Sequence, residues 1–480
     1  MSRLQDTRNQ RLEKINKLKD LGINPFAHRF NKKQSVGESR KLLGENTQTA
    51  GRIMAIRGYG VLVFMDLVDE TDKIQLIINL KKLSETEQKV IPLLDIGDII
   101  GVSGQVIESK SGELSIDVEK LTLLTKAIRP LPSQWYGLKD KEERYRKRYL
   151  DLLLDNDLKK IFRQKAIFWN SFRKFLLNKG FLEVETPVLE NTTGGAEADS
   201  FVTHHNALDI DVYLRISMGE LWQKRLMVGG FEKTFEIGRQ FRNEGISPEH
   251  LQDYTQMEFY LAYADYETTM KLAEEMYKYV AQETFNTLQF TIKKHKIDLG
   301  GQWGKIDYTQ TILQKTGIDI SKATVDQLKD KLTSLKIKYD IGGSRGRLID
   351  YLWKHIRKSI IGPVFLVNHP VEVSPLAKRK EKDPRFVERF QIIIAGSEMG
   401  NGYSELNDPL DQEARFKEQQ KARESGDLEA QMHDKDFVQA LEYGMPPVSG
   451  FGVSERLFSF LVDKPIRETV LFPLLKPENK

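Results

Sequence analysis

The chain has 480 residues, too many for one hydrophobic core, so its length predicts two or three domains. Its 40% hydrophobic and 30% charged residues are typical of a soluble globular protein. With 73 basic and 69 acidic side chains, the formal net charge of +4 permits RNA binding through local patches without indicating it. Cysteine is absent, which excludes disulfides, thiolate zinc sites and cysteine nucleophiles and agrees with a reducing compartment.

The first 22 residues are polar and charged and lack the apolar core of a signal peptide, and no apolar run in the chain reaches membrane-spanning length. Arg8 to Leu21 is predicted to be an amphipathic helix that ends at Gly22. The apolar residues on its one face are Leu12, Ile15, Leu18 and Leu21. A helix packed on the protein surface is the favoured interpretation, and a basic helix that touches RNA is the alternative.

Between about Ala50 and Lys126 the sequence changes to short β runs that Gly and Asp residues separate. The runs are Arg52–Ile56, Val61–Phe64, Lys73–Ile78, Ile99–Val106 and Leu114–Val118. Five such runs predict a small all-β barrel of the oligonucleotide-binding (OB) type, with a generic β barrel as the alternative. The prolines at 130 and 132 then predict a linker, and 142–151 is expected to be a solvated helix or an interdomain contact.

The remainder, from about residue 150 to 480, is predicted to be α+β. Lys159 to Asn178 and Tyr266 to Gln282 have helical spacing, and Asp265 is the expected N-cap of the second helix. Residues 285–365 contain further helices such as Val325–Leu335. The charge run Lys378–Asp383 is interpreted as a solvated loop rather than a binding patch.

Two β runs on either side of a Gly/Pro-containing loop carry the most informative pattern. In the first run, apolar Phe235, Ile237 and Phe241 alternate with polar residues or glycine, which are Glu236, Gly238, Gln240, Arg242 and Glu244. In the second run, one face holds Tyr254, Gln256, Glu258 and Tyr260. An arginine, carboxylates and aromatic rings on one face suit a ligand with both charge and a flat ring. A solvated edge hairpin explains the alternation equally well.

Longer stretches resemble a known family. Phe241–Glu244, His250 and Gln256–Tyr260 resemble motif 2 of the class II aminoacyl-tRNA synthetases. Three further segments narrow the resemblance to the lysyl-tRNA synthetases: Gly194–Ala196, Phe201–Arg215 and Asn401–Pro409. Gly180–Pro187 is similar to motif 1, which forms the homodimer interface in that family, and Gly450–Phe458 is similar to motif 3. The resemblance extends from about residue 50 to 473.

The resemblance implies a fold and a domain plan. It implies an antiparallel class II sheet with flanking helices and an N-terminal OB-fold barrel. The expected parts are a helix and lead-in at 1–48, an anticodon-binding barrel at 49–128, a linker at 129–150 and a catalytic domain at 151–480. A helical insertion is expected at about 285–365.

It also implies an activity: ATP-dependent activation of L-lysine to lysyl-adenylate and transfer to the 3′ end of tRNA(Lys). This chemistry needs no protein nucleophile, because the substrate carboxylate attacks the α-phosphate and the enzyme aligns the reactants and neutralises charge. Mg²⁺ is the implied cofactor, and a cytoplasmic homodimer that uses lysine, ATP and tRNA(Lys) is expected. No membrane partner is expected.

The matching positions carry the implied roles. Catalysis falls to Arg242 and Arg456, whose guanidinium forks suit phosphate and carboxylate oxygens. The ATP-binding positions are Arg242, Glu244, His250, Tyr254, Glu398 and Arg456. The lysine-binding positions are Gly195, Glu220, Arg242, Glu258, Tyr260, Asn401, Tyr403 and Glu405. The metal positions are Glu398 and Glu405, and the anticodon positions are Phe64, Gln75 and Glu113.

The chain departs from the family pattern in three places. Gln391 replaces a metal-binding glutamate, and an amide binds Mg²⁺ more weakly than a carboxylate. Motif 3 is one residue shorter before Arg456, and Ile216–Glu220 is one residue longer. The alternatives are an aspartyl- or asparaginyl-tRNA synthetase, an enzyme that lysylates another protein, and a non-catalytic RNA-binding protein. Glu405 has the wrong charge for the first, and the barrel argues against the second.

Overall fold

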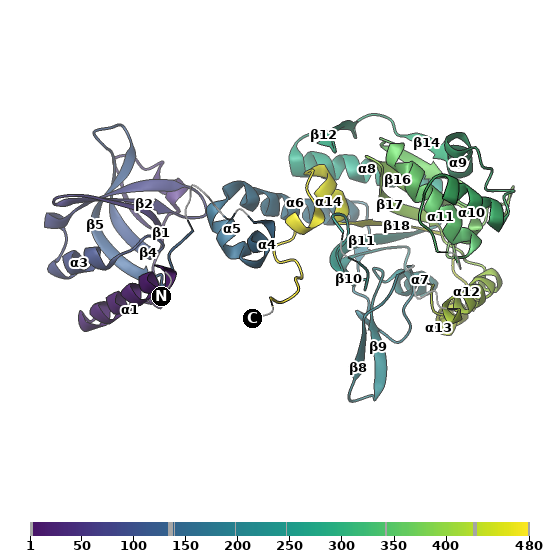
Figure 1. Ribbon diagram of the computed structural model, residues 1–480, viewed down its shortest axis with the longest axis horizontal. Coiled ribbons are helices and arrows are strands. Elements are labelled where there is room, and N and C mark those ends of the chain that lie inside the picture. The colour runs from purple at the N-terminus through teal and green to yellow at the C-terminus, as the bar shows by residue number, and fades with distance from the viewer. Residues whose placement is uncertain are drawn as a thin grey trace. The chain divides into compact units, whose positions relative to one another are not determined.

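The computed structural model describes residues 3–132, 138, 140–196, 198–245, 247–340, 343–425 and 430–478. The chain divides into two compact units, Met1–Leu154 and Asp155–Lys480 (Figure 1). The predicted linker at 129–150 falls partly on residues 133–137 and 139, which lie outside the described residues. No helix among the described residues is long and apolar enough to cross a membrane.

The first unit is a closed barrel with the strand order β1-β2-β3-β5-β4. The strands are β1 (Asn46–Tyr59), β2 (Leu62–Val68), β3 (Lys73–Asn79), β4 (Ile99–Glu108) and β5 (Leu114–Thr125). All pairs are antiparallel except β3 with β5. Alternate residues such as Met65, Leu67 and Leu76 fill the interior, and α2 (Val36–Ser39) and α3 (Glu85–Val90) lie outside the strands. The predicted OB-type barrel is confirmed.

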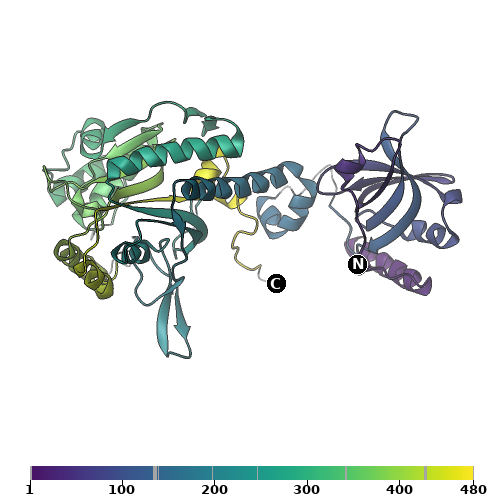
Figure 2. The same cartoon turned by 180° about the vertical axis from the view of Figure 1, so that it is seen from behind.

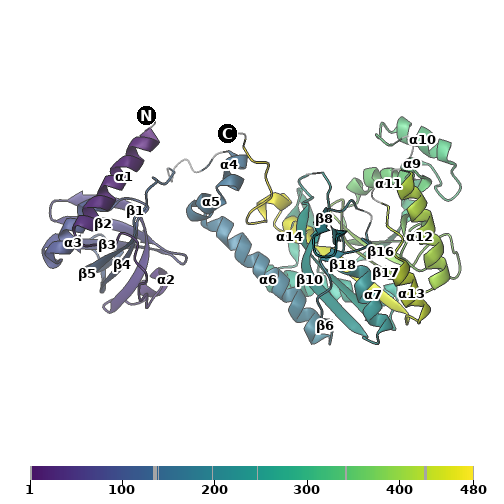
Figure 3. The same cartoon turned by 90° about the horizontal axis from the view of Figure 1, so that it is seen from below.

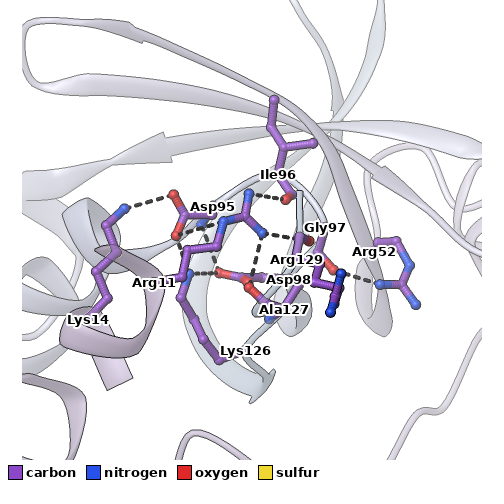
Figure 4. Close-up of polar contacts among 10 residues, drawn as sticks. All are labelled: Arg11, Lys14, Arg52, Asp95, Ile96, Gly97, Asp98, Lys126, Ala127 and Arg129. Carbon is purple, nitrogen blue, oxygen red and sulfur yellow. Dashed lines mark hydrogen bonds and ion pairs between the residues drawn. The ribbon is translucent and has the colours of Figure 1, made fainter. Parts of the chain in front are cut away.

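A buried cluster of charges joins the helix α1 (Arg3–Asp20) to the barrel (Figure 4). The ammonium of Lys126 is fully buried and lies 2.5 Å from Oδ2 of Asp95 and 2.7 Å from Oδ2 of Asp98. From α1, Lys14 pairs with Asp95 at 2.8 Å, and Arg11 donates to the carbonyl oxygens of residues 96, 127 and 129. These basic residues face the barrel, which agrees with the favoured interpretation that the first helix packs on the protein surface.

The second unit is built on an eight-stranded sheet of order β14-β15-β16-β17-β18-β11-β10-β6. Only the end pairs β14–β15 and β10–β6 are parallel, so the middle of the sheet is antiparallel as predicted. The strands are β6 (Leu182–Glu183), β10 (Lys233–Phe241), β11 (Asp253–Ala262), β14 (Gly304–Asp307), β15 (Val364–Val367), β16 (Arg389–Ile394), β17 (Ser397–Ser404) and β18 (Val448–Ser454).

Two long helices, α6 (Asn156–Asn178) and α8 (Tyr266–Phe285), cover the apolar face of this sheet (Figure 2). Phe168 and Phe172 of α6 and Met276 of α8 share one core with Phe259 and Phe451 of the sheet. The first helix starts three residues before the predicted position because the Asp155 carboxylate accepts hydrogen bonds from the amides of residues 157 and 158. The second ends three residues later than predicted, at Phe285, and is followed by the left-handed C-cap Asn286.

Residues 285–365 are not purely helical. They hold α9 (Tyr308–Thr316), α10 (Val325–Ser334) and α11 (Arg345–Ile356), which pack around their own core. They also hold a hairpin of β12 (Gln289–Ile292) and β13 (His295–Asp298), and they contribute β14 and β15 to the main sheet.

The remaining helices include α7 (Glu220–Val228), α12 (Pro409–Glu424) and α13 (Lys435–Glu442), which pack together (Figure 3). A small sheet of β7 (Leu189–Glu190), β9 (Ile210–Leu214) and β8 (Val202–His205) projects from the unit as a hairpin (Figure 1). Motif 3 continues from β18 into α14 (Arg456–Leu461). The stretch 142–151 lies in two short helices, α4 (Lys141–Arg146) and α5 (Arg148–Leu154).

Candidate active site

The register of the sheet gathers the predicted polar residues into two rows. One row runs Glu236, Glu258, Gly452, Asn401 and Gln391 across β10, β11, β18, β17 and β16. In the neighbouring row, Gly450 lies between Tyr260 and Tyr403. A side chain on the central strand would collide with these neighbours, because a Cβ at Gly450 would lie 2.4 Å from Glu405 Oε1. The glycines of β18 therefore let the functional groups of both flanking strands approach its backbone.

Three buried carboxylates, Glu220, Glu258 and Glu405, come together here; we refer to them as the carboxylate cluster. Glu258 accepts a hydrogen bond from the Tyr260 hydroxyl at 3.0 Å and another from the Met218 amide at 3.2 Å. Glu220, the first residue of α7, accepts one from the Tyr403 hydroxyl. The cluster therefore brings together residues that are nearly two hundred positions apart in the chain.

The sequence did not reveal the partner of this cluster, Lys224. Its ammonium is fully buried and lies 2.9 Å from Glu220 Oε1 and 2.5 Å from Glu405 Oε2. Burial acts to lower the pKa of Lys224, but the two carboxylates outweigh it and raise that pKa, so the side chain is an ammonium ion. Its position one helical turn after Glu220 is a signal that sequence reasoning could have used.

Burial also controls the protonation of the cluster. It raises the pKa of Glu258, and the like charge of Glu220 adds to this shift. Burial raises the pKa of Glu405 as well, although Lys224 opposes the shift. One buried cation thus does not satisfy three carboxylates, and the cluster favours the binding of further positive charge.

The longer segment before α7 still places Glu220 in the cluster. Gly219, which precedes the helix, has a left-handed backbone with φ of 66°, and a Cβ there would lie 2.1 Å from Thr186 Oγ1. Gly195 packs against the same segment, since its Cβ would lie 2.5 Å from Ser217 Oγ and 2.8 Å from Glu220 Cβ. These two glycines let the segment pack closely, and Glu220 is buried.

Cationic groups gather at the motif 2 loop. Arg242 follows β10, donates from Nε to the Ile216 carbonyl at 3.2 Å and stands 5.9 Å from the centre of the Tyr254 ring. Burial, aided by Arg456, lowers the pKa of His250, so its ring is neutral at pH 7 and accepts or donates one hydrogen bond with Ser247. The backbone oxygen of Glu244 in the same loop accepts a hydrogen bond from the Gln252 amide at 3.1 Å.

The shortened motif 3 places its arginine beside these groups. Arg456 is the first residue of α14, and it donates a hydrogen bond to the backbone oxygen of Glu398, while its Nε has no partner. Glu455 before it is fixed by Lys165 and by the Thr255 amide, which donates to Oε1 at 3.2 Å. These contacts hold Arg456 at the start of α14, beside Glu398.

A β-bulge between Ile392 and Ile393 sets the position of Glu398. The bulge puts Glu398 on the same face as Asn401, although the two residues are three apart. Arg357 lies 2.6 Å from Glu398 Oε1, and Trp353 donates to the same oxygen at 3.0 Å. Burial acts to raise the pKa of Glu398, but Arg357 and Arg456 outweigh it and hold that pKa below its usual range.

The other residues of the predicted metal site are engaged elsewhere. Gln391 Oε1 lies 3.2 Å from Nε2 of buried His369, and Glu405 faces Lys224. Within the part of the chain that the structure describes, no group of three His, Cys, Asp or Glu residues could hold a metal ion. A single carboxylate that shares Mg²⁺ with substrate phosphates fits Glu398, whereas an all-protein cage does not fit these residues.

Asn401 has a partner that the sequence did not indicate. Arg389 Nε donates to Asn401 Oδ1 at 2.8 Å, and its Nη1 donates to the Val373 carbonyl oxygen and the Ser374 hydroxyl. The charge run 378–383 is also more ordered than expected, because Arg379 pairs with Asp411 at 3.0 Å. Arg379 remains partly exposed to solvent, so this ion pair anchors the run without burying it.

On the barrel, two of the three predicted anticodon positions, Gln75 and Glu113, contact each other, and Gln75 is buried. Phe64 and Gln75 lie on β2 and β3, out of phase with the interior residues. Gln75 Nε2 donates to Glu113 Oε2 at 3.1 Å, and Ser115 donates to Gln75 Oε1 at 3.0 Å. The amide and the carboxylate thus form one hydrogen-bonded group.

Comparison with known proteins identifies the family. The model of class II tRNA synthetases (D, K and N) matches residues 140–476, and that of the OB-fold nucleic acid binding domain matches residues 48–124. The chain is 45% identical to the lysine–tRNA ligase of Moorella thermoacetica over 98% of both chains. It belongs to the lysine–tRNA ligase family. The chain is also similar to two further lysine–tRNA ligases. It is 45% identical to that of Fervidobacterium nodosum, over 99% of this chain and 95% of the relative. It is 44% identical to that of Thermotoga maritima, over 99% of this chain and 97% of the relative.

Family membership confirms the predicted resemblance and fold class. The antiparallel sheet and the barrel are the two parts that the family models match. Among the predicted site residues, the sheet unites Glu258, Tyr260, Asn401 and Tyr403 with Glu220 and Glu405. Glu398 and Glu405, which were expected to share a metal, are bound to different cations.

Proposed function

We propose that the protein activates L-lysine with ATP and transfers the lysyl group to the 3′ end of tRNA(Lys), as a lysine–tRNA ligase. The observation that carries this proposal is the carboxylate cluster, with Tyr260 and Tyr403 beside it and cationic side chains at the adjacent motif 2 loop. An amino acid with two ammonium groups satisfies such a cluster, whereas an aspartate or asparagine side chain does not. The retained cluster equally disfavours a non-catalytic RNA-binding protein.

In the proposed reaction, the lysine carboxylate attacks the α-phosphate of ATP and pyrophosphate leaves. Arg242 binds the carboxylate and the α-phosphate because a guanidinium can hold two oxygens at once. Tyr254 offers its ring to adenine, and Arg456, whose Nε is free of protein partners, binds the terminal phosphate together with His250. Glu405 and Tyr260 bind the ε-ammonium, and the remaining lysine-binding positions orient the α-ammonium and the carboxylate.

Mg²⁺ completes the proposed site. When bound, it neutralises charge on the phosphates. Glu398 would hold it, and Gln391 would contribute an uncharged oxygen at most. We do not assign Glu405 to the metal, because its carboxylate lies against Lys224.

We further propose that the barrel reads the anticodon. Phe64 would stack on an unpaired base, while Gln75 and Glu113 would bind its edge, which is how proteins recognise single-stranded RNA. The proposed role in translation places the protein in the cytoplasm.

A homodimer through motif 1 is supported by exposed apolar side chains at the end of α6 and on the strand β6 that follows it. Leu177 of α6 is 50% exposed, and Leu182 of β6 is 47% exposed. Large exposed apolar side chains of this kind are typical of protein–protein interaction sites. Analytical ultracentrifugation of the protein and of Leu182→Asp tests this, and an unchanged mass for the variant would refute it.

Lysine-dependent exchange of pyrophosphate into ATP tests the main proposal. The parent protein should exchange only when lysine is present, and Glu405→Gln should raise the KM for lysine, because losing one partner of a buried charged pair costs about 2–5 kcal/mol. Glu190→Gln removes a buried carboxylate outside the cluster and is the matched control. Exchange that needs no lysine, or normal lysine use by Glu405→Gln, would refute the assignment.

A further inference from the structure

We propose that Lys224 is a positioning residue, a resident ammonium ion that fixes Glu220 and Glu405 and sets the charge of the lysine site. This inference rests on the proposed lysine activation. Lys224 is fully buried and lies in α7, where its Nζ is 5.5 Å from the centre of the Tyr403 ring and 5.9 Å from that of Phe437. Aromatic faces on two sides and carboxylates on the others define its position.

The bonds of Lys224 orient the free oxygens of both carboxylates. It contacts Oε2 of Glu405, and the other oxygen, Oε1, lies over the backbone of Gly450, where a Cβ would be 2.4 Å away. On Glu220, Lys224 and the Tyr403 hydroxyl both bind Oε1, so these bonds leave Oε2 unengaged. One oxygen of each carboxylate thus contacts the protein's ammonium, and Oε1 of Glu405 lies beside Gly450 of β18.

The charge count fits the substrate. When all three carboxylates are ionised, which is the form that binds lysine, the cluster and the positive Lys224 together carry two negative charges. Lysine brings two ammonium groups, while its carboxylate is assigned to Arg242. Without Lys224 the cluster would carry a third charge that lysine cannot compensate, and an unpaired buried charge is strongly unfavourable. Lys224 therefore matches the cluster to an amino acid with two ammonium groups.

The test measures lysine and ATP dependence of pyrophosphate exchange in Lys224→Met, which keeps the length of the side chain and removes its charge. We expect the KM for lysine to rise at least about tenfold while the KM for ATP stays the same, because ATP binds elsewhere in the site. Lys126→Met is the matched control: it also removes a fully buried ammonium between two carboxylates, but in the barrel. An unchanged KM for lysine in Lys224→Met, or equal rises for lysine and ATP, would overturn the inference.

A double variant keeps the inference testable if Lys224→Met does not fold. Lys224→Met with Glu405→Gln removes both partners, so it leaves one fewer unpaired charge than the single substitution. If Lys224 acts through its two carboxylates, Lys224→Met should raise the KM for lysine less in the Glu405→Gln background than in the parent, because one of the two partners is already absent. Equal rises in the two backgrounds would mean that Lys224 acts independently of Glu405 and would overturn the inference. A parent protein without lysine-dependent exchange would instead refute the proposed function.

Discussion

Gly450 offers a direct test of how the lysine site is built, because it has no side chain where two pocket residues meet. In Gly450→Ala, the new methyl group would start 2.4 Å from Glu405 Oε1 and 2.6 Å from Tyr260 Cε1. Ordinary contact begins near 3.4 Å, so each neighbour has to move by about 1 Å. Overpacking of this kind costs about 1–3 kcal/mol. If the cost falls on lysine binding, kcat/KM for lysine decreases by about 5- to 140-fold, since 1.4 kcal/mol is a factor of ten.

Two neighbouring glycines provide controls for this substitution. A Cβ at Gly402 would overlap the core ring of Phe390 at 2.7 Å, so Gly402→Ala should lower the thermal stability without a selective effect on lysine. At Gly452 the nearest atom is Glu258 Cγ at 3.1 Å, so Gly452→Ala should have a smaller effect than Gly450→Ala. Pyrophosphate exchange at varied lysine and ATP measures each KM. A normal KM for lysine in Gly450→Ala would refute the placement of Glu405 and Tyr260 in the pocket.

Three further predictions concern the metal, the pH and the barrel. Gln391→Glu should lower the Mg²⁺ concentration that pyrophosphate exchange requires, because it adds a charged ligand. If exchange activity depends on Mg²⁺ in the same way in the parent and the variant, position 391 is not in the metal site. Burial raises the pKa of Glu258 and Glu405, and lysine binds their ionised forms. The KM for lysine should therefore fall as the pH rises from about 6 to about 8, because more of both carboxylates is then ionised. A KM for lysine that does not change with pH over this range would contradict the prediction. Phe64→Ala should weaken tRNA binding by about 1–3 kcal/mol and leave exchange unchanged, and normal charging of tRNA would exclude Phe64 from the anticodon site.

The alternation of polar and apolar residues was enough to predict the face of the hairpin that carries the site. Glu258 and Tyr260 lie on the polar side and Phe259 in the core, as period two requires. The alternative interpretation, a solvated edge hairpin, is wrong because β18 pairs with β11, the second strand of the hairpin, and places it inside the sheet. That pairing joins residues nearly two hundred positions apart, which no local pattern reveals.

Other features depended on tertiary contacts in the same way. The ammonium of Lys224 reaches Glu405 only because α7 packs beside the end of β17, so a charged residue in a short helix gave no sign of full burial. The bulge that turns Glu398 to the site face lies at Met399 and is set by the pairing with β16, although the adjacent Gly400 is a residue type that often marks a bulge. Helix ends were missed by a few residues where a cap such as Asp155 sets the boundary.

The bonds of Arg11 to the carbonyl oxygens of Ala127 and Arg129 give α1 a role in any excised barrel. A fragment that begins at Asn46, where the first strand begins, would lose both these bonds and the pairing of Lys14 with Asp95. The stretch after β5 would keep the hydrogen bond from the Ala127 amide to Asp98, and the aspartates would keep their ion pairs with Lys126. A fragment that retains all of these contacts begins at the first helix and extends past residue 129, well beyond the strands that define the barrel.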